Sequence, residues 1–233
     1  MAIDFSFVLS YSIFCLIEVV VFTLCFKIYI STSGASLAYK KWAQANFLLL
    51  TGCLLFVLCG LLFECSDSIS INKNELMLII GNTLIVFGYF YVPLGVLYLS
   101  KDFGVARVNE LLIKRTQIIF YSIISILAVI LVILTPFYKF IEIIGFLFCV
   151  VFALIWVFTL YFYKKIYESV LKSMNTCWTF IYIGMIFGFI SEIFNASYYI
   201  IPALVYPLLV SQLIMAVSLI IGFFKLAKMV GAI

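Results

Sequence analysis

The chain has 233 residues, of which 67% are hydrophobic and only 10% charged, and its net charge is +4. Soluble domains carry about 25% charged residues, so this chain has too little polar material to cover a soluble core. The composition therefore excludes an ordinary soluble domain and predicts an all-α, polytopic membrane protein. Histidine is absent and the seven cysteines show no metal-ligand spacing, so we expect no metal and no cofactor.

Seven apolar stretches are each long enough to span a bilayer, which takes about 20 residues. Only helices and closed barrels satisfy the backbone in lipid, and these stretches lack the alternation of barrel strands. We therefore expect a single seven-helix transmembrane domain over residues 1–233. The predicted spans are 5–26, 42–63, 76–99, 117–138, 140–163, 177–199 and 202–224.

The basic residues alternate between the connecting segments. Twelve lie in the first, third and fifth loops and after the last span, whereas two lie in the second and fourth loops. The positive-inside rule then predicts an N-terminus outside, a cytoplasmic C-terminus and a multi-pass protein of the cell membrane. The lysines mark orientation, so nucleic acid is not an expected partner. The third loop, residues 101–115, is either a short amphipathic surface helix or a solvated loop.

Glu18 lies inside the first apolar stretch, about 20 Å below the outer edge by the rise of a helix. An ionisable residue at membrane depth is costly and is by default a candidate functional residue. Tyr11 and Cys25 share its helical face, and no Lys or Arg is near in sequence. We expect Glu18 to be protonated or to meet a polar group on another helix, as a structural contact or as a functional site.

Glu192 continues a stripe with Gly184 and Gly188 at intervals of four residues. Small residues at this spacing are typical of close helix packing, so both glycines are predicted packing positions. The sixth and seventh spans form an antiparallel pair, which predicts a polar cluster of Glu192, Asn195, Ser211 and Gln212 in the outer half of the bundle. The predicted axial offset between Glu18 and Glu192 is about 10 Å, too far for a shared proton.

The third span contains Gly88, Pro93 and Gly95, which predict a kink and are hinge candidates. Broken helices of this kind occur at transporter binding sites, although Pro and Gly are common in membrane helices in general. Aromatic residues from Tyr89 to Tyr98 are interpreted as part of an aromatic belt near the inner interface.

The number of helices and their orientation resemble those of rhodopsins, G-protein-coupled receptors and the seven-helix sensor modules of prokaryotic kinases. The sequence motifs of these families are missing: the last span has no central lysine for retinal, and no NPxxY ends it. The resemblance is therefore one of topology.

Catalysis is not expected, because nucleophile elbows, phosphate-binding loops and acidic metal clusters are all missing from the sequence. We expect a non-enzymatic module for binding, sensing or assembly that works through partner membrane proteins. The alternative is a small transporter or channel subunit that uses Glu18 and Glu192 as proton- or cation-linked sites. The expected partners are the lipid bilayer and other membrane subunits or further copies of the chain.

Overall fold

The computed structural model describes residues 5–34, 36–65, 71–105, 108–134, 141–171, 176–198 and 201–233, and within them it contains helices and no strand. Seven α-helices account for most of these residues. They are α1 (Phe5–Ser31), α2 (Leu37–Cys65), α3 (Ile71–Asp102), α4 (Glu110–Leu134), α5 (Ile141–Ile166), α7 (Thr176–Tyr198) and α8 (Val205–Met229). A π-helical turn, η2 (Tyr167–Leu171), extends α5, and a 3-10 turn, η3 (Pro202–Leu204), precedes α8. The prediction of an all-helical fold is confirmed.

Each predicted span falls on one of these helices, and most helices extend beyond the predicted ends. Five of them, α1, α3, α5 with η2, α7 and α8, contain described stretches long and apolar enough to cross a membrane. The chain is thus a multi-pass membrane protein by the length and composition of its helices. The tight turn predicted between the fourth and fifth spans lies at residues 135–140, outside the described residues.

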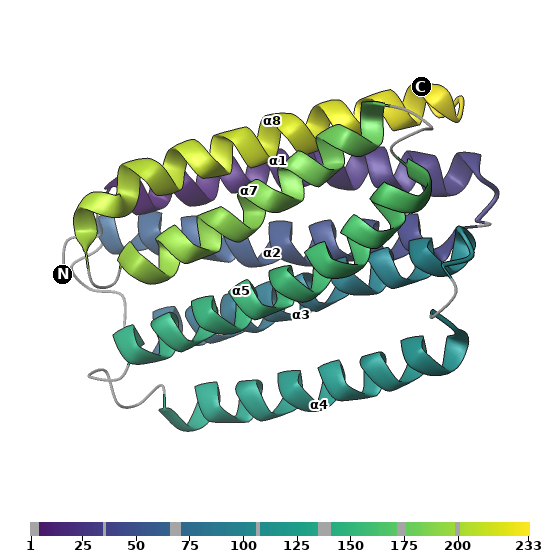
Figure 1. Cartoon of the computed structure of the whole chain (residues 1–233). Helices are drawn as coiled ribbons and strands as arrows, with labels where there is room; N and C mark the ends of the chain where they lie inside the picture. The colour runs from purple at the N-terminus through teal and green to yellow at the C-terminus, as the bar shows by residue number, and fades with distance from the viewer. Residues whose placement is uncertain are drawn as a thin grey trace.

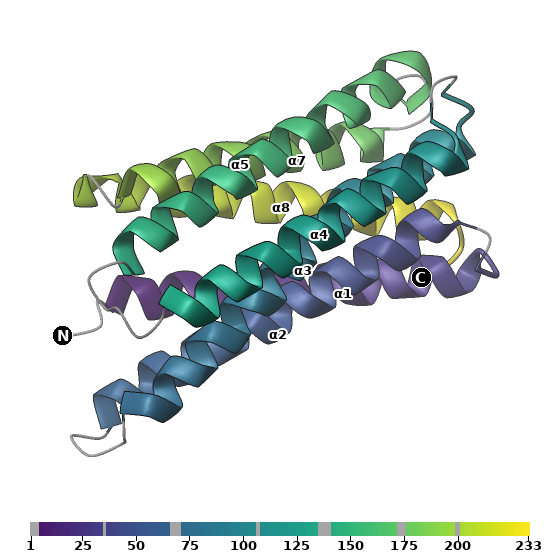
Figure 2. The ribbon, with the colours of Figure 1, turned by 90° about the horizontal axis from the view of Figure 1, so that it is seen from below.

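Six of the seven described helices form a closed ring. In the order α1, α2, α3, α5, α7, α8, each helix packs against the next, and α8 packs back against α1. Helix α4 packs mainly on α3 and lies outside this ring, at the edge of the molecule opposite α8 (Figure 1). The view from below shows α4 running alongside α3 (Figure 2).

Glycines allow the most extensive helix contacts of the ring. A Cβ atom on Gly52 of α2 would lie 2.6 Å from Cγ1 of Ile85 and 2.8 Å from the Gly81 carbonyl, both on α3. A Cβ on Gly222 of α8 would lie 2.6 Å from Cγ1 of Ile181 on α7. Because lipid tails are as apolar as the side chains, close packing of this kind holds membrane helices together in place of the hydrophobic effect.

Polar contacts gather at the end of the bundle where α3 ends and α4 begins. Ser36 donates a hydrogen bond of 2.8 Å to Asp102, and Lys101 forms an ion pair of 2.7 Å with Glu110. Helix α3 continues to Asp102 and α4 begins at Glu110, so residues 110–115 of the third loop form the first turns of α4. Apart from Lys73, near the start of α3, the described lysines and arginines lie at this same end, as the sequence pattern predicts. The assignment of this end to the cytoplasm stays a prediction.

Candidate functional site

Glu18 lies near the middle of α1 and is buried, with 6% of its surface exposed. Its Oε2 atom has no hydrogen-bond partner in the part of the chain that the structure describes. Two thiols of the same helix, Cys15 and Cys25, lie within electrostatic range of its carboxyl group. A thiol is a weak donor, so these neighbours leave the acid poorly solvated.

Glu192 lies on α7, on the opposite side of the ring from the α2–α3 pair, and is 4% exposed. The hydroxyl group of Tyr89 on α3 donates a hydrogen bond to its Oε1 atom. The side chain of Asn195, one turn further along α7, also hydrogen-bonds to this carboxyl group. Its Oε2 atom, like that of Glu18, has no partner among the described residues. Glu192 is therefore held in place on one oxygen and free on the other.

The two acids belong to one neighbourhood. Tyr89 of α3 and Cys53 of α2 each lie within electrostatic range of both carboxyl groups. Glu18 lies 13 residues before the end of α1, and Glu192 lies 16 residues after the start of α7. These two helix ends lie at the same end of the bundle. These counts give an axial offset of about 5 Å, half of that predicted from the sequence, because the helices extend past the predicted spans by unequal lengths.

Tyr89 is the site residue that sequence reasoning missed. Its ring stacks on Phe152 of α5 with centroids 4.3 Å apart and meets the edge of Trp156 at 6.3 Å. The interpretation of Tyr89 as part of an interfacial aromatic belt is therefore wrong, since its hydroxyl reaches across the ring to Glu192. Tyr89 lies 13 residues before the end of α3, as Glu18 does before the end of α1, but these helix ends are evident only from the structure.

The predicted cluster around Glu192 is brought together in part. Ser211 and Gln212 of α8 are both buried. The Ser211 hydroxyl donates to the carbonyl of Leu208 on its own helix, at 2.8 Å. Asn195 hydrogen-bonds to Glu192. The carboxyl group of Glu192 also receives a hydrogen bond from α3, which the short turn between α7 and α8 did not predict.

Gly184 and Gly188 lie where other helices approach α7 most closely. A Cβ atom on Gly184 would lie 2.6 Å from Cγ of Leu219 on α8. On Gly188 it would lie 2.8 Å from Cζ2 of Trp156 and 3.2 Å from Sδ of Met215. The stripe that leads to Glu192 is therefore a packing surface for both α5 and α8.

The hinge candidates lie within a continuous helix, since α3 runs through Pro93 without a break. A Cβ on Gly88 would lie 2.7 Å from Cγ of Leu49, and Gly95 lies against the indole of Trp42, so both glycines face α2. Pro93 has no N–H group to donate to the Tyr89 carbonyl one turn earlier, which loosens α3 next to the site. Motion at these positions stays a prediction.

Comparisons with models of protein families, with curated proteins and with solved structures found no match. The site must therefore be interpreted from its own chemistry. No group of three His, Cys, Asp or Glu side chains that could hold a metal ion occurs among the described residues. The arrangement presents two buried carboxyl groups, a tyrosine hydroxyl and aromatic rings, which together can hold a proton, water or a small polar molecule.

Proposed function

We propose that this chain is a non-enzymatic protein of the cell membrane that acts as a binding and assembly module. It has an internal polar site at Glu18, Tyr89 and Glu192, and it contacts a partner membrane protein through α4. The observation that carries this proposal is an exposed stripe with two serines between aliphatic side chains, on the side of α4 that faces away from the ring.

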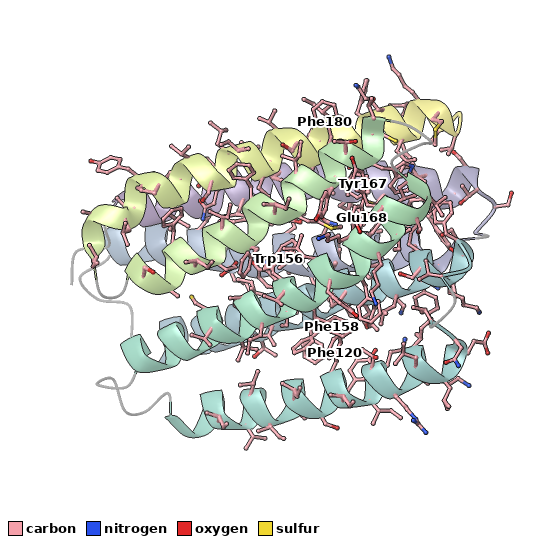
Figure 3. The ribbon with its side chains drawn as sticks, viewed as in Figure 1. Phe120, Trp156, Phe158, Tyr167, Glu168 and Phe180 are labelled. Carbon is pink, nitrogen blue, oxygen red and sulfur yellow. The ribbon has the colours of Figure 1, made fainter. Side chains whose placement is uncertain are left out.

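Helix α4 has two distinct faces. Ile113, Thr116, Phe120 and Leu127 point toward the ring: the first two are buried, and the others are partly buried. Phe120 contacts Phe90 of α3 at 4.8 Å between ring centroids and Phe158 of α5 at 5.9 Å, and Figure 3 shows Phe120 and Phe158 close together. This face attaches α4 to the bundle.

The opposite face of α4 carries Ile118, Ser122, Ser125 and Val129, at spacings of four, three and four residues, and all four are exposed. We call these four residues the outer stripe. The Ser125 hydroxyl donates to the carbonyl of Tyr121 at 2.8 Å, which leaves a small, flat surface between the two aliphatic side chains. Small hydroxyl residues flanked in this way are typical of contacts between membrane helices, because they let a second backbone approach closely.

Closure of the ring without α4 supports the same proposal. Helices α1 and α8 complete the ring, so α4 is not needed to enclose the internal site. A helix attached along one face, with two small hydroxyl side chains between aliphatic ones on the other, is suited to lie between the ring and a transmembrane helix of a partner. A signal from the internal site then passes to the partner through α3, against which both Glu192 and α4 are placed.

Purification from native membranes in mild detergent tests this proposal. The expected result is a stoichiometric membrane partner that is lost in the Ser122→Leu and Ser125→Leu variants. Thr23→Leu is the matched control, because Thr23 is also exposed and donates to the carbonyl four residues earlier, at 2.8 Å, but lies on α1. Loss of the partner in the control as well, or retention in all variants, would contradict a contact through the outer stripe.

A second candidate function is proton- or cation-linked transport, which the free oxygens of Glu18 and Glu192 inside the ring favour. Carboxyl groups at membrane depth on different helices are typical of such pathways. Flux into vesicles reconstituted with the purified chain, abolished by Glu18→Gln and by Glu192→Gln, would establish this function in place of the first.

A further inference from the structure

We infer that the ligand of the internal site is a proton rather than a metal cation, and that water links Glu18 to Glu192 beside Tyr89. This inference rests on the internal site of the proposed module and names what that site binds. It applies equally if the module proves to transport its ligand.

Three polar atoms around Tyr89 have no hydrogen-bond partner in the described part of the chain. They are Oε2 of Glu18, Oε2 of Glu192 and Nε1 of Trp156. All three residues are more than nine-tenths buried. Buried polar groups in folded proteins are almost always satisfied by protein or ordered water, so each of these atoms indicates a bound group.

The indole of Trp156 faces the stripe that carries Glu192. Its Cζ2 atom lies 2.8 Å from the Cβ position of Gly188, and Nε1 is joined to Cζ2 through a single ring carbon. Glu192 follows Gly188 by one helical turn on the same face of α7. The unpartnered N–H donor therefore belongs to an indole that contacts Tyr89, the residue that lies within electrostatic range of both acids.

Water fits this combination of atoms and a metal cation does not. Water accepts a hydrogen bond from an indole N–H and donates to a carboxyl oxygen, whereas a metal cation is repelled by the N–H and satisfies only the oxygens. Metal ions such as Ca²⁺ take six or more oxygen ligands, but the described site offers two carboxyl groups, one of which Tyr89 and Asn195 already engage.

The charges around the site also favour a proton. Among the residues whose side chains the structure describes, the titratable groups facing the two acids are Cys15 and Cys25 of α1, Cys53 of α2, Tyr89 of α3 and Cys149 of α5. The buried polar side chains described on α8 are Ser211, Gln212 and Ser218, which do not titrate. None of these groups is a cation, so a proton is the neutralising charge that the site itself can hold.

Proton binding here forms one bond on the acid and breaks one in the proton donor, which leaves as water or as the conjugate base of the buffer. A proton delivered from solvent by hydronium or a buffer acid forms an O–H bond on a carboxylate oxygen, and the carboxylate becomes a neutral carboxylic acid. Tyr89 keeps its own proton, because its hydroxyl donates to Oε1 of Glu192. The incoming proton is therefore held on a free Oε2 atom, and bridging water carries it between the two acids.

Infrared spectroscopy of the wild-type chain in phosphatidylcholine nanodiscs tests the inference. We expect a C=O stretching band of protonated carboxyl groups whose size falls as pH rises, and which stays unchanged when Na⁺, K⁺ or Ca²⁺ is added at constant pH. Glu18→Gln and Glu192→Gln are each expected to remove part of this band. Glu168→Gln is the control and leaves it intact, because Glu168 is exposed at the end of the bundle.

A second band reports on the water. We expect O–H stretching bands of bound water that shift in H₂¹⁸O and are partly lost in Trp156→Phe, which keeps an aromatic ring but removes the donor. A carboxyl band lost on addition of a cation at constant pH would overturn the inference in favour of a cation site. A carboxyl band of the same size at every pH, or no water band sensitive to Trp156→Phe, would also overturn it. The cation titration uses only the wild-type chain and tests the proton site alone. The purification of the α4 partner is a separate experiment, so failure of the proton site can be distinguished from failure of the proposed contact through α4.

Discussion

The Tyr89 hydroxyl donates a hydrogen bond to the Glu192 carboxyl group, which joins α3 to α7 across 103 positions of the chain. This bond crosses the ring between helices that are not neighbours within it. It also places the Tyr89 ring between Glu192 and the aromatic side chains of α5. The internal site is therefore a link between the first three helices and the last three.

Tyr89→Phe is expected to destabilise the fold by about 1–3 kcal/mol, because it leaves Oε1 of the buried Glu192 without its strongest donor. Tyr91→Phe is the control: its hydroxyl lies 3.3 Å from that of the exposed Tyr121, where the surroundings can replace the lost contact. Unfolding of the purified variants by denaturant in detergent measures both effects. Equal losses of stability in the two variants would show that the bond to Glu192 has no special role.

Gly52→Ala is expected to destabilise the α2–α3 contact by about 1–3 kcal/mol through overpacking. The atoms that a new Cβ would meet include the backbone carbonyl of Gly81, at 2.8 Å, which cannot move alone. Gly184→Ala should cost less, since its two nearest atoms belong to the flexible end of the Leu219 side chain. Thermal unfolding should show a larger loss of stability in Gly52→Ala than in Gly184→Ala. The reverse order would contradict the described packing.

Phe120→Ala is expected to release α4 from the ring without unfolding it. Phe120 contacts both Phe90 and Phe158, and α4 otherwise packs mainly on a single helix, α3. Amide exchange in α4 should become at least about tenfold faster, which corresponds to about 1.4 kcal/mol of lost local stability. Exchange in α7 and α8 should be unchanged. Ile119→Ala, on an exposed position of α4, is the control. Equal acceleration in all helices would show that α4 is part of the same cooperative unit.

The ion pair between Lys101 and Glu110 makes the α3–α4 connection sensitive to pH. The hydrogen bond from Lys101 lowers the pKa of the Glu110 carboxyl below its ordinary value of 4.5. Because the pKa of Glu110 is lowered in the folded state, the ion pair stabilises the folded state at pH values above the ordinary pKa. This stabilisation is lost as the pH falls through the pKa of the folded state. Titration of the Glu110 carboxyl carbon by NMR should show the lowered pKa, and Lys101→Met should return it toward 4.5. An unchanged value in that variant would contradict the pair.

Much of the fold is predictable from the sequence, because bilayer thickness sets the length of each apolar stretch. The all-helical class and the position of each helix follow from this constraint alone. The closed ring and the outer position of α4 do not follow from it. They depend on side-chain contacts such as those of Phe120 and Gly52, which span length and hydropathy do not encode.

The candidate site is predictable only in part. Glu18 and Glu192 are evident from the sequence, since a carboxyl group within an apolar stretch is costly in lipid. Tyr89 is not, because a tyrosine at a helix position of uncertain depth is equally typical of an interface. The relation between the acids depends on how far each helix extends past its apolar stretch, and this length is set by packing at the helix ends.

Site-specific photo-crosslinking in native membranes tests the proposed coupling between the internal site and α4 most directly. A photoreactive residue replaces Val129 of the outer stripe, 56% exposed, or Leu154 of α5, 64% exposed, as the matched control. We predict a defined crosslink to one membrane protein from position 129, changed in yield by Glu18→Gln, and only lipid adducts from position 154. Lipid adducts alone from both positions, or a protein crosslink that is unaffected by Glu18→Gln, would contradict a module that passes the state of its internal site to a partner through α4.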